Sequence, residues 1–119
     1  MTSVCLRIGW CQPGENRAWT LSAAGVPNAD DAVKNPDEDR DLRWFQNMWL
    51  SNTDLIRVVT AAVQAAPTDW PSRGIIVNAM SGNTGMAWDI ETARKLLGYE
   101  PIDDVRRALA EQSSAISDE

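Results

Sequence analysis

The sequence predicts an α/β fold with a parallel sheet, and three observations support this. Two short apolar runs, 4–9 and 75–78, are predicted strands because they are rich in β-branched residues and are bounded by turn residues. Between them, segment 53–66 has the apolar periodicity of a helix. Two shorter helical segments follow the second run. Strands that alternate with helices favour a parallel arrangement.

The first strand ends at Gly9, and segment 10–42 is predicted to be a long irregular loop with an acidic insertion. Its acidic residues are Asp30, Asp31, Asp37, Glu38, Asp39 and Asp41. A loop of this length is either a functional lid or a solvated insertion. The composition of its acidic middle favours the solvated insertion.

The helix predicted over 53–66 carries one apolar stripe, because its apolar residues recur at spacings of three and four. These residues are Leu55, Val58, Val59, Ala62, Val63 and Ala66. Ser51 is expected to accept a hydrogen bond from a free N–H of the first turn, and Asp54 is expected to reach back in a capping box. Pro67 is expected to end the helix.

The second strand has three consecutive apolar residues, which predicts burial on both faces. After a flexible turn, Asp89 is expected to cap a helix that ends at Leu97, with Gly98 as its C-terminal cap. Asp103 or Asp104 is expected to cap a last helix.

The whole chain, 1–119, is predicted to be a single segment with a frayed tail over 113–119. Two parallel strands do not form a stable sheet alone, since both faces and both edges need cover. We therefore expect the chain to self-associate, or to pair with a partner chain, through its sheet.

Charge and composition exclude several function classes. The net charge is −6, with 17 acidic and 11 scattered basic residues, so nucleic-acid binding is not expected. No apolar run approaches the roughly 20 residues that span a bilayer, and the N-terminus does not resemble a secretory signal. Cys5 and Cys11 are expected to be reduced thiols in a cytoplasmic protein.

The sequence contains no histidine. A Ser-His-Asp triad and a Cys-His pair are therefore impossible, and a zinc site would lack its commonest ligand. No metal ligand and no catalytic residue is assigned. Any acid–base chemistry would fall to carboxylates, to the single tyrosine or to a lysine.

Four short segments follow one another in a defined order. They are Leu6-Arg7-Ile8-Gly9 followed by Pro13; Trp49-Leu50-Ser51-x-x-Asp54-Leu55; Val77-Asn78-x-x-Ser81 followed by Trp88-Asp89; and Ala93-Arg94-x-Leu96-Leu97-Gly98-Tyr99-x-Pro101-x-Asp103. This order resembles the extended short-chain dehydrogenases/reductases, the NAD-dependent epimerase/dehydratase family, and within it the uronate dehydrogenase-like proteins. The resemblance implies a partial Rossmann-like parallel sheet (its late strands) with substrate-domain helices and a missing N-terminal half.

The resemblance also implies a function, the substrate-side C-terminal portion of an NAD-dependent sugar or sugar-acid oxidoreductase or epimerase. Members of the family bind NAD through a Gly-rich turn at the first strand, and their base is a Tyr-x-x-x-Lys pair. Neither motif is present: the single tyrosine is Tyr99, and Asp103 stands four residues later. We therefore expect neither NAD binding nor catalysis by this chain alone. The alternatives are a stand-alone binding or interaction module and an inactive truncated product.

Site residues follow from the resemblance as well. The substrate side would be formed by Arg43, Ser51, Trp10 and Trp49, and the cofactor side by Ile8, Gly9 and Cys11. The guanidinium of Arg43 would bind a substrate carboxylate, a role for which its fork is suited. Arg40 is a nearby alternative. A surface ion pair with Asp39 or Asp41 is an equally weighted interpretation of Arg43.

Trp10 marks a departure from the family. Relatives tend to carry a small polar residue directly after Arg-Ile-Gly, where it touches the sugar. A tryptophan fills that space or stacks on a ring, which puts uronate itself in doubt as the substrate. Core packing is the competing interpretation of this side chain.

Overall fold

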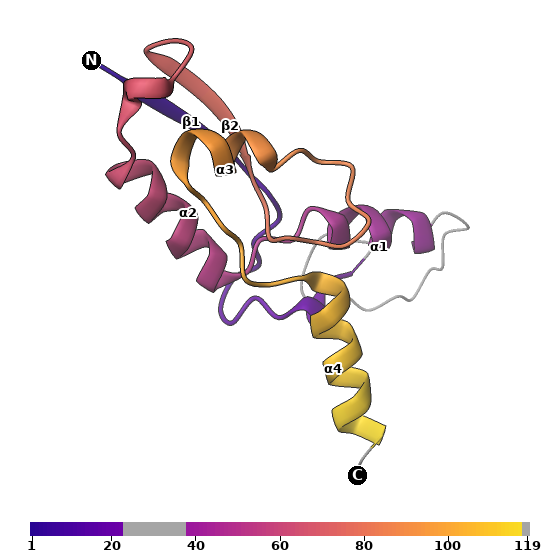
Figure 1. The fold of residues 1–119 in the computed structure, drawn as a ribbon. Helices are drawn as coiled ribbons and strands as arrows, with labels where there is room; N and C mark the ends of the chain where they lie inside the picture. Colours follow the sequence, from indigo (N-terminus) through magenta and orange to yellow (C-terminus); the bar gives the residue numbers. More distant parts are fainter. Residues whose placement is uncertain (23–37, 118–119) are drawn as a thin grey trace.

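A computed structural model of the protein describes residues 1–22 and 38–117. In chain order its elements are β1 (Ser3–Ile8), the short 3-10 helix η1 (Ala18–Thr20), α1 (Glu38–Asn47), α2 (Asn52–Gln64), the 3-10 helix η2 (Pro67–Asp69), β2 (Gly74–Ala79), α3 (Glu91–Leu97) and α4 (Val105–Ser117). Figure 1 shows their arrangement. The predicted α/β class is confirmed for this part of the chain.

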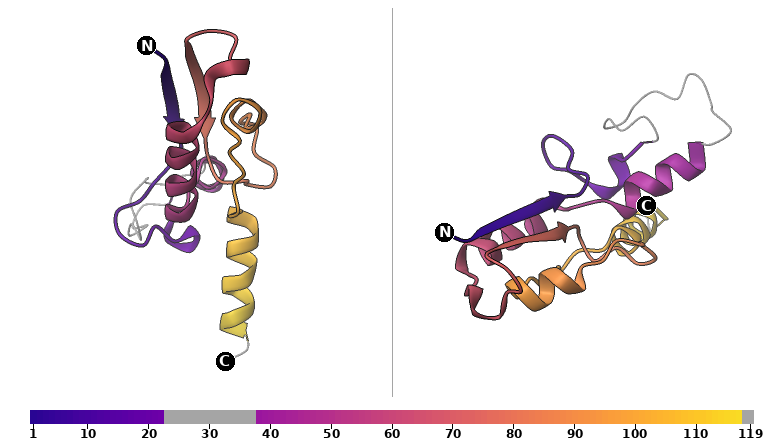
Figure 2. Two further views of the ribbon diagram at one scale, coloured as in Figure 1. Left: turned by 60° about the vertical axis from the view of Figure 1, so that its left-hand side comes forward. Right: turned by 90° about the horizontal axis from the view of Figure 1, so that it is seen from above.

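The two strands lie side by side and run parallel, as the sequence predicts. Val4 stands opposite Ile75 and Leu6 opposite Val77 in the register. Since the strands are parallel, their carboxyl ends meet at one edge of the sheet. Figure 2 shows α2 beside the strands and α4 extending away from that edge.

One face of the sheet carries the main core. Ile75 and Val77 of β2 are buried there against Val58 of α2 and Leu97 of α3. Tyr99 completes this cluster, and its hydroxyl donates a hydrogen bond of 2.8 Å to the carbonyl oxygen of Met80. Helices α2 and α3 therefore pack on the same face of the sheet.

The opposite face of the sheet is open within the described residues. Ile76 is 57% exposed, and Cys5, its partner in the register, is exposed too. The prediction that the second strand is buried on both faces is therefore wrong. Its physical reason is that α2 and α3 share one face, so an apolar run in β2 meets cover on one side only.

Helix α2 presents a narrower buried stripe than its periodicity predicts. Val58 is fully buried, whereas Val63 is 80% exposed and Val59 is exposed as well. The inward side is completed by Ala61 and Ala62, whose small side chains permit a close approach to the sheet. Val59 and Val63 therefore lie on the solvent side of α2, next to its contact with the sheet.

Two irregular segments of the prediction prove to be partly helical. Helix α1 begins at Glu38 and η1 covers Ala18–Thr20, both inside the predicted loop 10–42. The acidic positions 30, 31 and 37 lie outside the described residues. Helix α4 continues to Ser117, through most of the predicted tail 113–119. Residues 108–112, directly before the tail, are alanine, leucine, glutamate and glutamine, which favour helix.

The expected helix caps are formed, with one exception. The Ser51 hydroxyl accepts from the N–H of Asp54 at 3.0 Å, the Asp89 carboxylate accepts from Glu91 at 2.9 Å, and Gly98 ends α3 with a φ of 72°. Asp54 does not reach back to Ser51: its carboxylate bonds the main chain ahead of α4. No helix in residues 1–22 and 38–117 is long and apolar enough to cross a membrane.

Candidate functional site

The chain that leaves β1 is held directly against the start of α2. The N–H of Trp10 donates to the Met48 carbonyl at 2.7 Å, and the N–H of Leu50 donates to the Trp10 carbonyl at 3.0 Å. These bonds form a parallel bridge between Trp10 and Trp49 beyond the end of the strand. In open parallel sheets, ligands bind outside the carboxyl ends of the strands, which directs attention to this edge.

The loop after this bridge is fixed by Asn16. Its side-chain oxygen accepts from the N–H of Gln12 at 2.9 Å and from the indole N–H of Trp49 at 3.2 Å, while its amide donates to the Leu50 carbonyl at 2.6 Å. Asn16 is buried and has a φ of 54°, a left-handed conformation that asparagine tolerates better than most residues.

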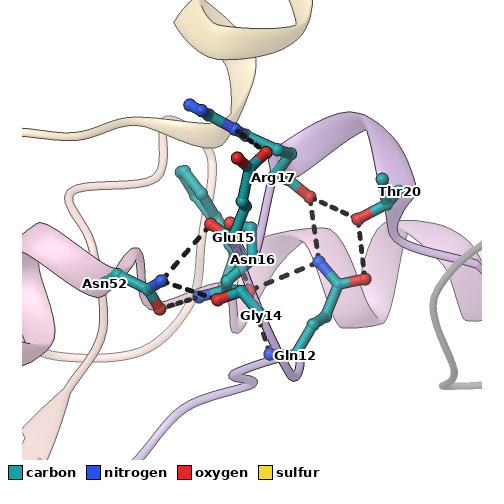
Figure 3. Close-up of polar contacts among 8 residues, drawn as sticks. Gln12, Gly14, Glu15, Asn16, Arg17, Thr20 and Asn52 are labelled. Atoms are coloured by element: carbon teal, nitrogen blue, oxygen red, sulfur yellow. Dashed lines mark hydrogen bonds and ion pairs between the residues drawn. The ribbon is translucent and has the colours of Figure 1, made fainter.

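Further side-chain bonds close the same loop on itself (Figure 3). The Gln12 amide donates to the Arg17 carbonyl at 2.9 Å, and the Thr20 hydroxyl donates to the Gln12 side chain at 2.9 Å. Asn52, at the start of α2, donates to the Gly14 carbonyl at 2.9 Å. The loop therefore has one defined geometry without help from a ligand.

The chain that leaves β2 is tied to the same place. The Ser81 hydroxyl accepts from the N–H of Ser51 at 3.0 Å. The amide of Asn83 donates to the Trp49 carbonyl at 2.9 Å, and its oxygen accepts from the N–H of Val105 at 3.0 Å. Both strand exits, the start of α2 and the start of α4 therefore converge on one rigid junction.

A cavity of about 580 Å³ opens beside this junction, a size typical of small-molecule sites. Its walls come from the 15–19 loop, from residues 49–53, and from Asp103 and one face of α4. The side chains of Trp19 and Trp49 give it aromatic surface. Its acidic groups are Glu15, Asp103 and Glu111. Helix α4 and η1, which form opposite walls, contact each other.

Two of the predicted substrate residues, Trp49 and Ser51, line this cavity. Their polar atoms are engaged within the protein, because the Trp49 indole donates to Asn16 and the Ser51 hydroxyl caps α2. They contribute wall surface more than ligand contacts. The polar groups left to meet a ligand are ones the sequence prediction missed, namely Glu15, Thr53, Asp103, Glu111 and Gln112.

The other two predicted substrate residues lie outside the cavity. Trp10 packs against Phe45 with ring centroids 4.9 Å apart, as the core-packing interpretation expects. Arg43 is exposed on α1 and does not line the cavity, while Arg40 pairs with Asp41 at 3.6 Å. Burial and the nearby charge of Arg43 lower the pKa of Arg106.

The three predicted cofactor residues, Ile8, Gly9 and Cys11, lie at the end of β1 and in the chain that follows it. A Cβ on Gly9 would stand 2.1 Å from the Met48 carbonyl oxygen, so this glycine is required by the chain crossing itself. The Cys11 thiol donates to the Leu50 carbonyl at 3.6 Å, and burial raises its pKa, which keeps it neutral. Ile8 alone presents free surface, being 53% exposed. We derive no chemical step through a nicotinamide cofactor from these residues.

No protein-family model, curated protein or solved structure matches the chain.

Proposed function

We propose that this chain is the substrate-side portion of an NAD-dependent sugar or sugar-acid oxidoreductase or epimerase of the extended short-chain dehydrogenase/reductase type. In this proposal β1 and β2 are late strands of a Rossmann-like sheet. The observation that carries the proposal is the convergence of both parallel strand exits on one preformed cavity. Its position outside the carboxyl ends of parallel strands is where such folds bind ligands.

The cavity suits a polyhydroxylated ligand. Carboxylates of Glu15, Asp103 and Glu111 accept hydrogen bonds from hydroxyl groups, and the amide of Gln112 both donates and accepts. The indoles of Trp19 and Trp49 supply apolar surface for the carbon skeleton of a sugar ring. These residues would bind and orient the sugar.

The reaction itself would need groups from polypeptide outside these 119 residues. A bound nicotinamide cofactor supplies hydride transfer in such enzymes. Tyr99 is no substitute for the family's catalytic tyrosine, because its hydroxyl is buried and donates to Met80, and burial raises its pKa. The open face of the sheet supports the expectation that another polypeptide, a second copy or a front-half partner, packs there.

The binding part of the proposal is tested by titrating sugars into isotopically labelled protein and recording the indole N–H resonances. We expect Trp19 and Trp49, which line the cavity, to shift, while Trp70 does not, because its indole is bonded to the Leu96 carbonyl away from the cavity. Ala108→Trp, which places a large ring into the cavity wall, should abolish the shifts. Unmoved Trp19 and Trp49 resonances with every sugar would contradict the proposal.

A separate test addresses the expectation that this chain alone neither binds the cofactor nor catalyses the reaction. Calorimetric titration of NAD and NADP should show no saturable binding tighter than about 100 μM, or about −5.5 kcal/mol. NADH production with galacturonate or glucuronate should be undetectable beside a full-length dehydrogenase control. Turnover that Tyr99→Phe abolishes would show that the catalytic group lies in this chain after all.

A stand-alone sugar-binding module is the second candidate. It is favoured by one observation: the side-chain bonds of Asn16 fix one wall of the cavity from within this chain. Light scattering coupled to size exclusion discriminates the two. A monomer at high concentration that unfolds cooperatively and still binds sugars favours the module, whereas self-association, or stable capture of a front-half chain, favours the enzyme portion.

A further inference from the structure

We infer that the cavity beside the strand exits binds neutral or positively charged polyols in preference to sugar acids. The inference rests on the proposed function, since it narrows the substrate class of that same site. It comes from the charges that line the cavity and from the way each of them is held.

Three carboxylates and one guanidinium line the cavity. The guanidinium is that of Arg17, and it is already engaged. Its Nε lies 3.3 Å from a carboxylate oxygen of Glu15, and its central carbon lies 5.6 Å from the ring centre of Trp19. The carboxylate of Glu15 therefore offsets the positive charge that Arg17 would present to a ligand carboxylate.

The remaining two carboxylates face the cavity without a counter-ion among the described residues. The main chain of Asp103 is fixed, since its N–H donates to Asp54 at 3.1 Å and its carbonyl accepts from Gly82 at 2.8 Å. Glu111 stands on α4 at the spacing that places it on the same helix face as Ala108 and Gln112, which also line the cavity. Negative charge therefore enters the cavity from two different elements.

The alternative anchor for a sugar acid does not reach this cavity. Arg43, which the family resemblance pairs with a substrate carboxylate, is exposed on α1 and is not part of the lining. A uronate in the cavity would therefore meet two uncompensated carboxylates, while the charge of Arg17 is already offset by Glu15. Such like-charge contacts are an effective means of rejecting a ligand.

The size of the effect follows from simple electrostatics. Two unit charges 4 Å apart interact by about 1 kcal/mol in bulk water, about a fivefold change in affinity, and a cleft lined by one sign of charge strengthens the field. Each carboxylate therefore lowers the affinity for a sugar acid, and raises the affinity for an amino sugar, by about this factor. Hydroxyl groups, in contrast, satisfy carboxylate oxygens as hydrogen-bond donors.

Three sugars that differ at few positions provide the test: galactosamine, galactose and galacturonate, titrated at neutral pH and low salt. We expect dissociation constants from the Trp19 and Trp49 indole shifts to rise in that order. Raising the salt concentration should weaken the binding of galactosamine, because salt screens the charge attraction, and leave the binding of galactose unchanged. Binding of galacturonate as tight as that of galactose would overturn the inference and leave the proposed function standing. Shifts with none of the three sugars would overturn the proposed function itself.

Charge-removing variants assign the selectivity to the cavity. Glu111→Gln, on an exposed helix face, should improve galacturonate binding relative to neutral galactose by about fivefold, and Asp103→Asn should act in the same direction. Asp69→Asn removes an equal charge from η2, away from the cavity, and should change nothing. Equal effects from Asp69→Asn and Glu111→Gln would mean that net charge alone is responsible, and would overturn the inference.

Discussion

The carboxylate of Asp54, in the first turn of α2, accepts a hydrogen bond of 2.8 Å from the main-chain N–H of Ile102, 48 residues further along the chain. Its second oxygen accepts from the N–H of Asp103 at 3.1 Å. Asp54 is fully buried, and the Nε of Arg57 lies 3.9 Å away. This one side chain therefore fixes the segment that leads into α4 and positions Asp103 at the cavity.

Asp54→Asn should destabilise the protein by about 2–3 kcal/mol, because the new amide NH₂ must face one of the two N–H donors that the carboxylate satisfied. Urea unfolding followed by tryptophan fluorescence measures the loss. Asp69→Asn, an exposed change of the same chemistry, should stay within about 0.5 kcal/mol of the unmodified protein. Equal unfolding midpoints for the two variants would contradict the assigned role of Asp54.

Asn83→Asp should weaken the junction at its other side. The Asn83 amide donates to the carbonyls of Asn47 and Trp49, and its oxygen accepts from the N–H of Val105. A carboxylate at this buried position would face two carbonyl oxygens, so we expect a loss of at least about 2 kcal/mol. Thermal unfolding measures it, and Asn78→Asp, whose amide makes one exposed bond to Asp89, is the matched control. A smaller loss for Asn83→Asp than for this control would refute the role given to Asn83.

The local part of this architecture was predictable, and the long-range part was not. The two strands (each end within one residue of the prediction), the Ser51 cap and the Gly98 cap follow from neighbours in sequence, and the structure confirms them. The partner of Asp54 lies 48 residues away, so a local capping rule assigned it wrongly. Glu111 was missed because the sequence does not reveal which element the last helix packs against. Asn16 was missed because its bonds form only once α2 starts beside the exit of β1.

Tyr99 should make the protein sensitive to high pH. Burial, followed by the nearby charge of Asp54, raises the pKa of its hydroxyl far above the ordinary value of about 10. The folded state thus holds this proton more tightly than the unfolded state. The resulting stability is complete below about pH 10 and is lost as the pH rises above it.

Since Tyr99 is the single tyrosine of the chain, its phenolate absorption reports this ionisation directly. We expect the absorption to appear together with the loss of tryptophan fluorescence, as one unfolding transition. Tyr99→Phe should be less stable at neutral pH, because the hydrogen bond to Met80 is lost, but its stability should change less above pH 10. Phenolate absorption that develops while the fold is intact would contradict the burial argument.

Gly9→Ala tests whether this glycine serves the chain's own packing or a cofactor. A Cβ there would stand 2.1 Å from the Met48 carbonyl oxygen and 2.8 Å from Cγ of Met80, and the carbonyl belongs to main chain already fixed by the Trp10 bridge. We therefore expect a loss of about 3 kcal/mol or more, or failure to fold. Gly14→Ala is the matched control: it has a φ of 78° but open space around it, so it should cost only about 1 kcal/mol. If Gly9→Ala folds with the stability of Gly14→Ala, the close approach to Met48 is not what requires glycine. The better explanation for glycine at this position would then be the close approach of a ligand that another polypeptide holds.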